Sequence, residues 1–244
     1  MSLQTIKAMK DMSPITAVIL AGGLGKRLRG VVSDRPKVLA EVNGRPFLTY
    51  LLDQLAEAGI NSVILCTGYM ADSISKEIGN LYNGVKITYS RENKPLGTGG
   101  ALKLAGQYMN GGYALVMNGD SFVEYDVQQF LSWHVMKRAS VSMVLAWVDN
   151  VNRFGSIKVN AEDDVNCFVE KGNISGSGFI NAGVYLMKQE TVDTIPDETP
   201  FSLEKQFFPY LVGRGLYGYQ MSERFIDIGT PESFAKVQSF FDAC

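Results

Sequence analysis

A glycine-rich turn near the N-terminus carries the residue types best suited to chemistry. The apolar run Thr16–Leu20 leads directly into Ala21-Gly22-Gly23-Leu24-Gly25-Lys26-Arg27-Leu28, with Arg29 and Lys37 as further cations soon after. Glycine permits positive φ and lets backbone N–H groups approach a phosphate closely. We therefore expect the turn to hold an anion, and the clustered cations favour a polyphosphate over a single phosphate.

Spacing excludes two well-known phosphate motifs at this turn. A P-loop requires glycine five residues before Gly25, where this chain has Leu20, and Ser or Thr directly after Lys26. A dinucleotide fingerprint that starts at Gly23 requires Gly or Ala where this chain has Leu28. From these residues alone, an ordinary glycine-rich turn between a strand and a helix remains the alternative.

Acidic residues end two apolar segments. Asp120 follows the run Tyr113–Met117, and Asp227 lies shortly before the last predicted helix. Open α/β sheets bind ligands at the carboxyl ends of their strands, and Mg²⁺ is commonly held by one or two carboxylates plus nucleotide phosphate oxygens. An Asp after a strand is also a common turn residue. We predict Asp120 as a metal ligand and Asp227 as the second candidate.

Two further polar segments could bind a substrate. The run from Glu92 to Ala101 is a polar turn that enters a helix, and Thr98 could cap that helix. Glu170 and Lys171 place an acid beside a base at the end of a strand, where a break after Glu170, supplied by Gly172, would let both face one site. A plain helix start and an exposed ion pair are the alternatives.

The pattern of apolar runs predicts the elements that position these residues. Short β-branched runs alternate with amphipathic stretches, which is typical of strands joined by crossover helices. The predicted strands are 16–20, 62–66, 85–89, 113–117, 141–148, 156–159, 165–170 and 179–187; the predicted helices are 47–58, 71–78, 98–108, 127–137 and 231–241. We expect an α/β fold with a mixed, mostly parallel sheet flanked by helices and a small β-rich lobe. Residues 1–14 are expected to be a flexible leader, and 15–244 a single domain with an α/β part at 15–150 and a strand-rich part plus final helix at 151–244.

Composition narrows the classes of protein. Of 244 residues, 46% are hydrophobic and 20% are charged, and the net charge is −2. This balance offers no basic surface for nucleic acid, and no apolar run approaches the length of a membrane span. Three cysteines, without metal-type spacing, argue against a disulfide framework and a zinc site, so we expect a cytoplasmic protein.

Five conspicuous side chains are expected to have structural roles and no part in binding or catalysis. His134 is expected on a helix surface, Cys66 and Cys167 in the core, and Trp133 and Trp147 in packing.

Together these motifs resemble the sugar-1-phosphate nucleotidyltransferase family. The resemblance is carried by the glycine-rich turn, by Pro36-Lys37 and by Gly44-Arg45-Pro46-Phe47, and it extends from Ile15 to Phe241. It implies a Rossmann-like, glycosyltransferase-A-like fold, with a nucleotide-binding part at 15–150 and a sugar-binding part plus the final helix at 151–244. It also implies that Arg27 holds the β- and γ-phosphates and that Lys37 stabilises charge on the α-phosphate. Lys26 departs from the family, which usually has Thr there.

The resemblance also implies the remaining binding roles. Arg27, Lys37 and Asp120 would be catalytic, and Asp120 and Asp227 would hold Mg²⁺ together. The implied nucleotide-binding residues are Leu20, Ala21, Gly22, Gly23, Gly25, Lys26, Arg27, Tyr69, Leu96, Gly97, Thr98 and Gly119. The implied sugar-phosphate residues are Gly155, Glu170, Lys171 and Asn181, with Arg153-Phe154-Gly155 as a sugar-site loop and Gly183 leaving room for the sugar ring.

The reaction implied joins a nucleoside triphosphate to a sugar 1-phosphate and releases pyrophosphate, without a protein nucleophile. Within the family, the chain is most similar to D-glycero-α-D-manno-heptose-1-phosphate guanylyltransferases, which implies GTP as the donor. Mannose 1-phosphate as acceptor, or UTP, CTP or dTTP as donor, are alternatives, and a catalytically silent nucleotide-sugar sensor is the alternative of another class. Whether the chain forms a homo-oligomer is left open.

Overall fold

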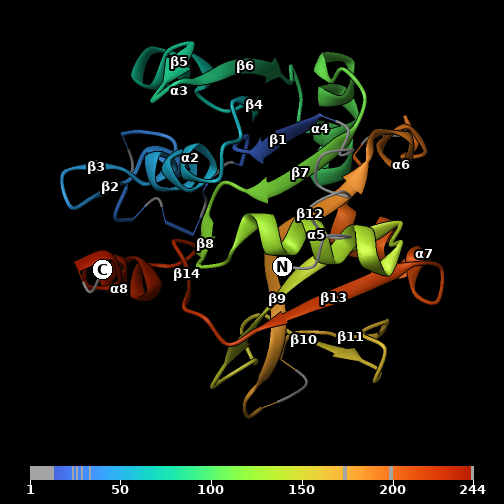
Figure 1. Cartoon of the computed structure of the whole chain (residues 1–244). Helices are drawn as coiled ribbons and strands as arrows, with labels where there is room; N and C mark the ends of the chain where they lie inside the picture. The colour runs from blue at the N-terminus through green and yellow to red at the C-terminus, as the bar shows by residue number, and fades with distance from the viewer. Residues whose placement is uncertain are drawn as a thin grey trace.

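One eight-stranded sheet forms the centre of the molecule, in the order β13-β9-β12-β7-β1-β4-β6-β5 (Figure 1). The computed structural model describes residues 14–23, 25, 27–28, 30–32, 34–172, 175–197 and 200–242, so the predicted leader lies outside the described residues except for Pro14. The strands are β1 (Ile15–Leu20), β4 (Ser62–Thr67), β5 (Leu81–Tyr82), β6 (Val85–Arg91), β7 (Tyr113–Asn118), β9 (Val141–Val148), β12 (Gly178–Lys188) and β13 (Leu216–Met221). Strands β12 and β5 run antiparallel to their neighbours, and the other strand pairs are parallel. The predicted mixed, mostly parallel sheet is confirmed.

Helices cover both faces of the sheet. Alternate residues of β1 point to opposite faces, so Ala17 and Ile19 join one buried cluster and Val18 joins the other. The first face is covered by α2 (Phe47–Glu57), α3 (Ala71–Ile78), α5 (Val127–Lys137) and α8 (Pro231–Asp242). The second is covered by α4 (Gly97–Ala105), α6 (Gln189–Asp193), the π-helical turn η3 (Leu203–Phe207) and α7 (Phe208–Leu211). Burial on both faces explains why the strands are continuous apolar runs.

Short ladders and turns complete the fold around the sheet. They are the antiparallel pairs β2 (Glu41–Val42) with β3 (Arg45–Pro46), β8 (Ser121–Val123) with β14 (Phe225–Asp227), and β10 (Ser156–Val159) with β11 (Val165–Val169), and the 3₁₀ turns η1 (Lys37–Leu39) and η2 (Gly106–Tyr108). Strands β10 and β11 project below the sheet in Figure 1 and correspond to the predicted β-rich lobe. Strand β12, which follows them in the chain, instead lies inside the main sheet between β7 and β9. Among the described residues, no helix is long and apolar enough to cross a membrane.

Two side chains expected in packing positions are exposed. Cys167 lies on β11, which is paired only within its two-stranded ladder, and its side chain faces solvent. Trp147 is 46% exposed near the end of β9, although its ring contacts Phe179. Cys66 is buried in β4, and Trp133 packs against the ring of Tyr219, so those two predictions are confirmed.

The prediction that His134 lies on the surface is wrong. His134 is 1% exposed, and its Nδ1 lies 2.7 Å from Oγ of Ser142 on β9. It follows Val127, Phe130 and Leu131 at helical spacings of seven, four and three residues, and all three are buried against the sheet. The spacing placed His134 on the buried face, and only its polar character suggested otherwise.

Burial of His134 makes the stability of the protein depend on pH. Desolvation, aided by the nearby charge of Lys188, lowers the pKa of His134 to about 4. In the unfolded chain the pKa of a histidine is about 6.5. The free energy of unfolding therefore has its full value above that pH and decreases as the pH falls toward about 4. We expect His134 to reduce the free energy of unfolding by about 3 kcal/mol across this window. Denaturant titrations at several pH values should show a shallower decline for His134→Asn, and an unchanged decline would contradict the assignment.

Candidate active site

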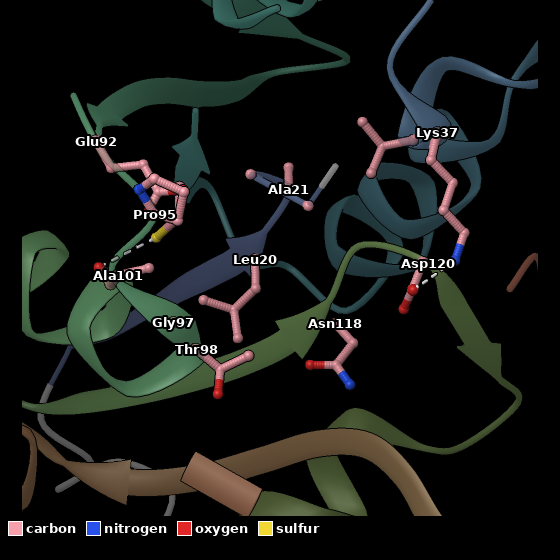
Figure 2. Close-up of a pocket in the computed structure, with 14 residues that line it drawn as sticks. Leu20, Ala21, Lys37, Glu92, Pro95, Gly97, Thr98, Ala101, Asn118 and Asp120 are labelled. Atoms are coloured by element: carbon pink, nitrogen blue, oxygen red, sulfur yellow. Dashed lines mark hydrogen bonds and ion pairs between the residues drawn. The ribbon is translucent and has the colours of Figure 1, made fainter. Parts of the chain in front are cut away.

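A cavity of about 310 Å³ opens at the carboxyl ends of β1 and β7, where parallel strands present their loops (Figure 2). It is lined by Leu20, Ala21, Gly22, Gly23, Lys37, Val38, Cys66, Glu92, Pro95, Gly97, Thr98, Ala101, Asn118 and Asp120. Six of the predicted nucleotide-binding residues are among them, together with Lys37 and Asp120. The motifs that the sequence singled out near residues 20, 37, 95 and 120 therefore meet in one place.

Other predicted residues lie outside this lining. Within the described residues, Gly25, Arg27, Tyr69, Leu96 and Gly119 are not part of the cavity wall. Lys26 lies outside the described residues.

Gly119 and Leu96 nevertheless support the wall. The N–H of Gly119 donates to the carbonyl of Leu20 at 3.0 Å, and a Cβ on Gly119 would lie 2.9 Å from that oxygen. The N–H of Leu96 donates to Oε2 of Glu92 at 3.0 Å.

Glu92 is a site residue that our sequence interpretation missed. A Cβ added to Gly22 would lie 2.9 Å from Glu92 Oε1, and one added to Gly68 would lie 2.6 Å from it. The carboxylate therefore packs against the glycine-rich turn on one side and the 92–101 turn on the other. Burial raises the pKa of Glu92, opposed by the hydrogen bond from Leu96. A signal was present, because Glu92 opens the polar segment in which Leu96, Gly97 and Thr98 were expected to bind the nucleotide.

The predicted capping role of Thr98 is wrong. Helix α4 begins at Gly97, one residue before Thr98, and its N–H groups at Gly99 and Gly100 donate to the carbonyl of Phe201. Thr98 Oγ1 instead donates to Oε2 of Glu204 at 2.7 Å and accepts from the N–H of Leu203 at 2.9 Å. A carbonyl from a distant segment thus replaces the local cap.

Glu204 was not among the predicted site residues, and this contact brings it beside the cavity. Gly97 has φ of +75°, and a Cβ there would lie 2.5 Å from the carbonyl oxygen of Phe201. The close approach of the two segments explains the glycine at this position.

Two cation–carboxylate pairs lie near one another, and one of them, Lys37–Asp120, belongs to the cavity wall. Lys37 Nζ donates to Asp120 Oδ2 at 2.7 Å, as Figure 2 shows, and the lysine side chain is 11% exposed. Arg153 donates to Asp227 Oδ2. The two aspartates are held together by the β8–β14 ladder, in which Ser121 pairs with Asp227, and by the N–H of Ile228, which donates to the Asp120 carbonyl at 2.9 Å.

Three of the predicted sugar-phosphate residues, Gly155, Glu170 and Lys171, lie on two turns that pack together. Gly155 has φ of +79°, and a Cβ there would lie 2.5 Å from the Val169 carbonyl and 3.3 Å from the Lys171 N atom, so the loop at Gly155 packs directly on the Glu170–Lys171 turn. Strand β11 ends at Val169, one residue before the predicted break, and both Glu170 and Lys171 are exposed.

Asn181 lies on β12, away from the Glu170–Lys171 turn in the chain. Its Nδ2 donates to Tyr185 Oη at 2.8 Å, and its Oδ1 accepts from the N–H of Gly183 at 2.9 Å. Gly183 has φ of +80°, and a Cβ there would lie 2.7 Å from Asn118 Nδ2 and 2.8 Å from Ser121 Oγ. The position that a Cβ of residue 183 would take is therefore occupied by protein side chains.

Comparisons with known proteins agree with this arrangement. The nucleotidyl transferase family model matches residues 16–243. The D-glycero-alpha-D-manno-heptose 1-phosphate guanylyltransferase of Aneurinibacillus thermoaerophilus is 37% identical over 223 residues, covering 91% of this chain and 96% of that protein. The mannose-1-phosphate guanylyltransferase of Mycobacterium tuberculosis is 37% identical over 226 residues, covering 91% of this chain and 63% of that protein.

A solved structure shares the whole architecture. HddC from Yersinia pseudotuberculosis, in its complex with GMP-PN, superposes with a TM-score of 0.82 at 35% identity, covering 93% of this chain and 99% of that one. Sequence and structure lead to the same conclusion: this chain belongs to the nucleotidyl transferase family.

Proposed function

We propose that this protein transfers a guanylyl group from GTP to D-glycero-α-D-manno-heptose 1-phosphate, giving the GDP-sugar and pyrophosphate. The observation that carries a nucleotidyl transfer is the cavity that runs from the glycine-rich turn to the Lys37–Asp120 pair. GTP as donor is supported by the names of the guanylyltransferase relatives and by the GMP-PN complex of HddC. Heptose is favoured because the heptose relative matches over nearly its full length; mannose 1-phosphate is the second candidate.

The chemistry requires positioning and charge neutralisation. An oxygen of the sugar phosphate attacks the α-phosphorus of the triphosphate in line, a new P–O bond forms, and the bond to the β-phosphate breaks to release pyrophosphate. Backbone N–H groups of the glycine-rich turn would hold the phosphates, and Arg27 would orient the leaving group. Lys37 would stabilise charge on the α-phosphoryl group, and Lys171 would place the attacking phosphate.

The donor set fits a magnesium ion. The carboxylates that would hold the ion are Asp120 and Asp227, which the β8–β14 ladder brings close together. Among the described residues, no group of three or more His, Cys, Asp or Glu side chains gathers as a metal site. Mg²⁺ is typically held by one or two carboxylates, with phosphate oxygens and water as its other ligands. When bound, the ion would neutralise phosphate charge.

Pyrophosphate release tests the proposal directly. The four nucleoside triphosphates are each paired with heptose, mannose and glucose 1-phosphates, with Mg²⁺ present or withheld. We expect turnover only with Mg²⁺, fastest with GTP and the heptose 1-phosphate. Faster turnover with mannose 1-phosphate would identify mannose 1-phosphate as the acceptor, and faster turnover with another triphosphate would identify that triphosphate as the donor. An absence of turnover with every pair would favour a nucleotide-sugar sensor.

A further inference from the structure

The ion pair between Arg153 and Asp227 occupies one of the two carboxylates proposed for the metal. Arg153 lies in the turn between β9 and β10, and its second guanidinium nitrogen, Nη1, is 3.4 Å from Oγ1 of Thr230. The other carboxylate oxygen of Asp227 accepts from the N–H of Gly229 at 2.6 Å and from Ser233 Oγ at 3.3 Å. The Asp227 side chain is 14% exposed. Gly229 and Ser233 are fixed donors on the loop and helix that follow Asp227, whereas Arg153 reaches it from a separate turn on a long, flexible side chain.

Charges of both signs surround this pair. Burial and the positive charge of Arg27 both lower the pKa of Arg153, while Glu232 and Asp120 act in the opposite direction. Arg27 is therefore close enough to repel Arg153, and Asp227 holds the guanidinium against that repulsion. A divalent cation on Asp227 would add a further positive charge beside Arg153, and two cations cannot share one carboxylate oxygen at hydrogen-bond range without strong repulsion.

We propose that Arg153 is a positioning residue that competes with the divalent cation for Asp227. In the metal-free protein Arg153 holds the carboxylate in place; when the metal binds, the guanidinium leaves Asp227 and faces the anionic substrates. The inference rests on the proposed function, because that function places the metal at Asp120 and Asp227. It implies that the apparent dissociation constant for the metal equals the intrinsic constant divided by the fraction of protein in which Arg153 does not occupy Asp227.

Titration of the nucleotide-free, full-length protein with Mn²⁺, followed by electron paramagnetic resonance, tests the competition. We expect Arg153→Gln to bind Mn²⁺ about fivefold more tightly than the wild type, the gain from removing an ion pair of ordinary strength. Arg153→Lys, which keeps the charge, should stay close to the wild type, and Asp227→Asn should bind more weakly. Arg214→Gln is the matched control, because Arg214 is exposed and precedes β13 at the opposite end of the strands.

A second readout separates competition from a general structural role. The KM for the sugar 1-phosphate should rise in Arg153→Gln while the Mn²⁺ dissociation constant falls, whereas a damaged site would weaken both. Equal or weaker Mn²⁺ binding by Arg153→Gln, or no Mn²⁺ binding by any variant, would overturn the competition. Pyrophosphate release by the wild type remains the separate test of the proposed function. A protein that binds Mn²⁺ as expected but turns over no substrate pair would refute the proposed function and leave the competition at Asp227 supported.

Discussion

Replacing Asp120 with alanine is expected to slow pyrophosphate release by about 10²- to 10³-fold, the usual effect of removing one charged group from a transition state. Asp120 pairs with Lys37 at 2.7 Å, and Lys37 is 11% exposed, so its removal leaves a nearly buried lysine without its carboxylate partner. It also removes one of the two carboxylates proposed to hold the metal. Initial rates of pyrophosphate release at saturating GTP and Mg²⁺ measure the effect.

Two further variants make that result specific. Asp120→Asn keeps the size of the side chain and can still accept a hydrogen bond from Lys37, so a similar loss of rate would assign the effect to the charge. Asp72→Ala removes a carboxylate from an exposed pair with Arg91, in which the side chains are 85% and 55% exposed, and should leave the rate unchanged. A nearly normal rate in both Asp120 variants would refute a role for Asp120 in the reaction.

Gly183→Ala is expected to lower the free energy of unfolding by about 2–4 kcal/mol and to distort the cavity. The backbone φ of +80° is unfavourable for alanine, and the added methyl would lie 2.7 Å from Asn118 Nδ2 and 2.8 Å from Ser121 Oγ. Asn118 lines the nucleotide cavity, and Ser121 directly follows Asp120, so relief of the clash must move the site. Denaturant unfolding together with the KM for GTP measures both effects.

Gly213→Ala is the matched control for that substitution. Gly213 has φ of +71°, but a Cβ there meets no described atom within 4 Å. It should therefore show the cost of backbone strain alone, about 1 kcal/mol, with an unchanged KM. If the two variants are equally stable, the packing of Gly183 against Asn118 is not as tight as the structure indicates.

Local patterns predicted the longer helices and six of the eight strands of the central sheet, because their causes are local, but β13 and β5 were not predicted. The ranges of α3, α5, β9 and β10 match the prediction residue for residue, since each is a run whose apolar spacing is complete within itself. The same reasoning located the glycine-rich turn and the strand end at Asp120, because glycine and aspartate there follow directly from an apolar run. His134 shows the limit of residue type: its spacing was correct, and its polarity was misleading.

Contacts between distant segments lay beyond such reasoning. Thr98 bonds to Glu204 across 106 positions, and Lys37 bonds to Asp120 across 83. Local spacing contains no information on which carbonyl will replace a helix cap, or on which carboxylate a lysine will meet. Cys167 was misjudged for a related reason, because a strand in a two-stranded ladder lacks the second covered face that strands of the central sheet have.

The position of β12 bears on how such an enzyme could acquire a new sugar preference. This strand belongs to the part of the chain after residue 150, yet it separates β7 from β9, both of which come from the part before it. A fragment that ended at residue 150 would expose the edges of two long apolar strands, which invites aggregation. The two parts of the chain therefore share one sheet, and neither part could be exchanged between relatives as an independent module. If the sugar 1-phosphate binds at the turns around Gly155 and Lys171, as proposed, acceptor specificity would diverge by point substitutions in those turns, while the strands beneath them stay the same.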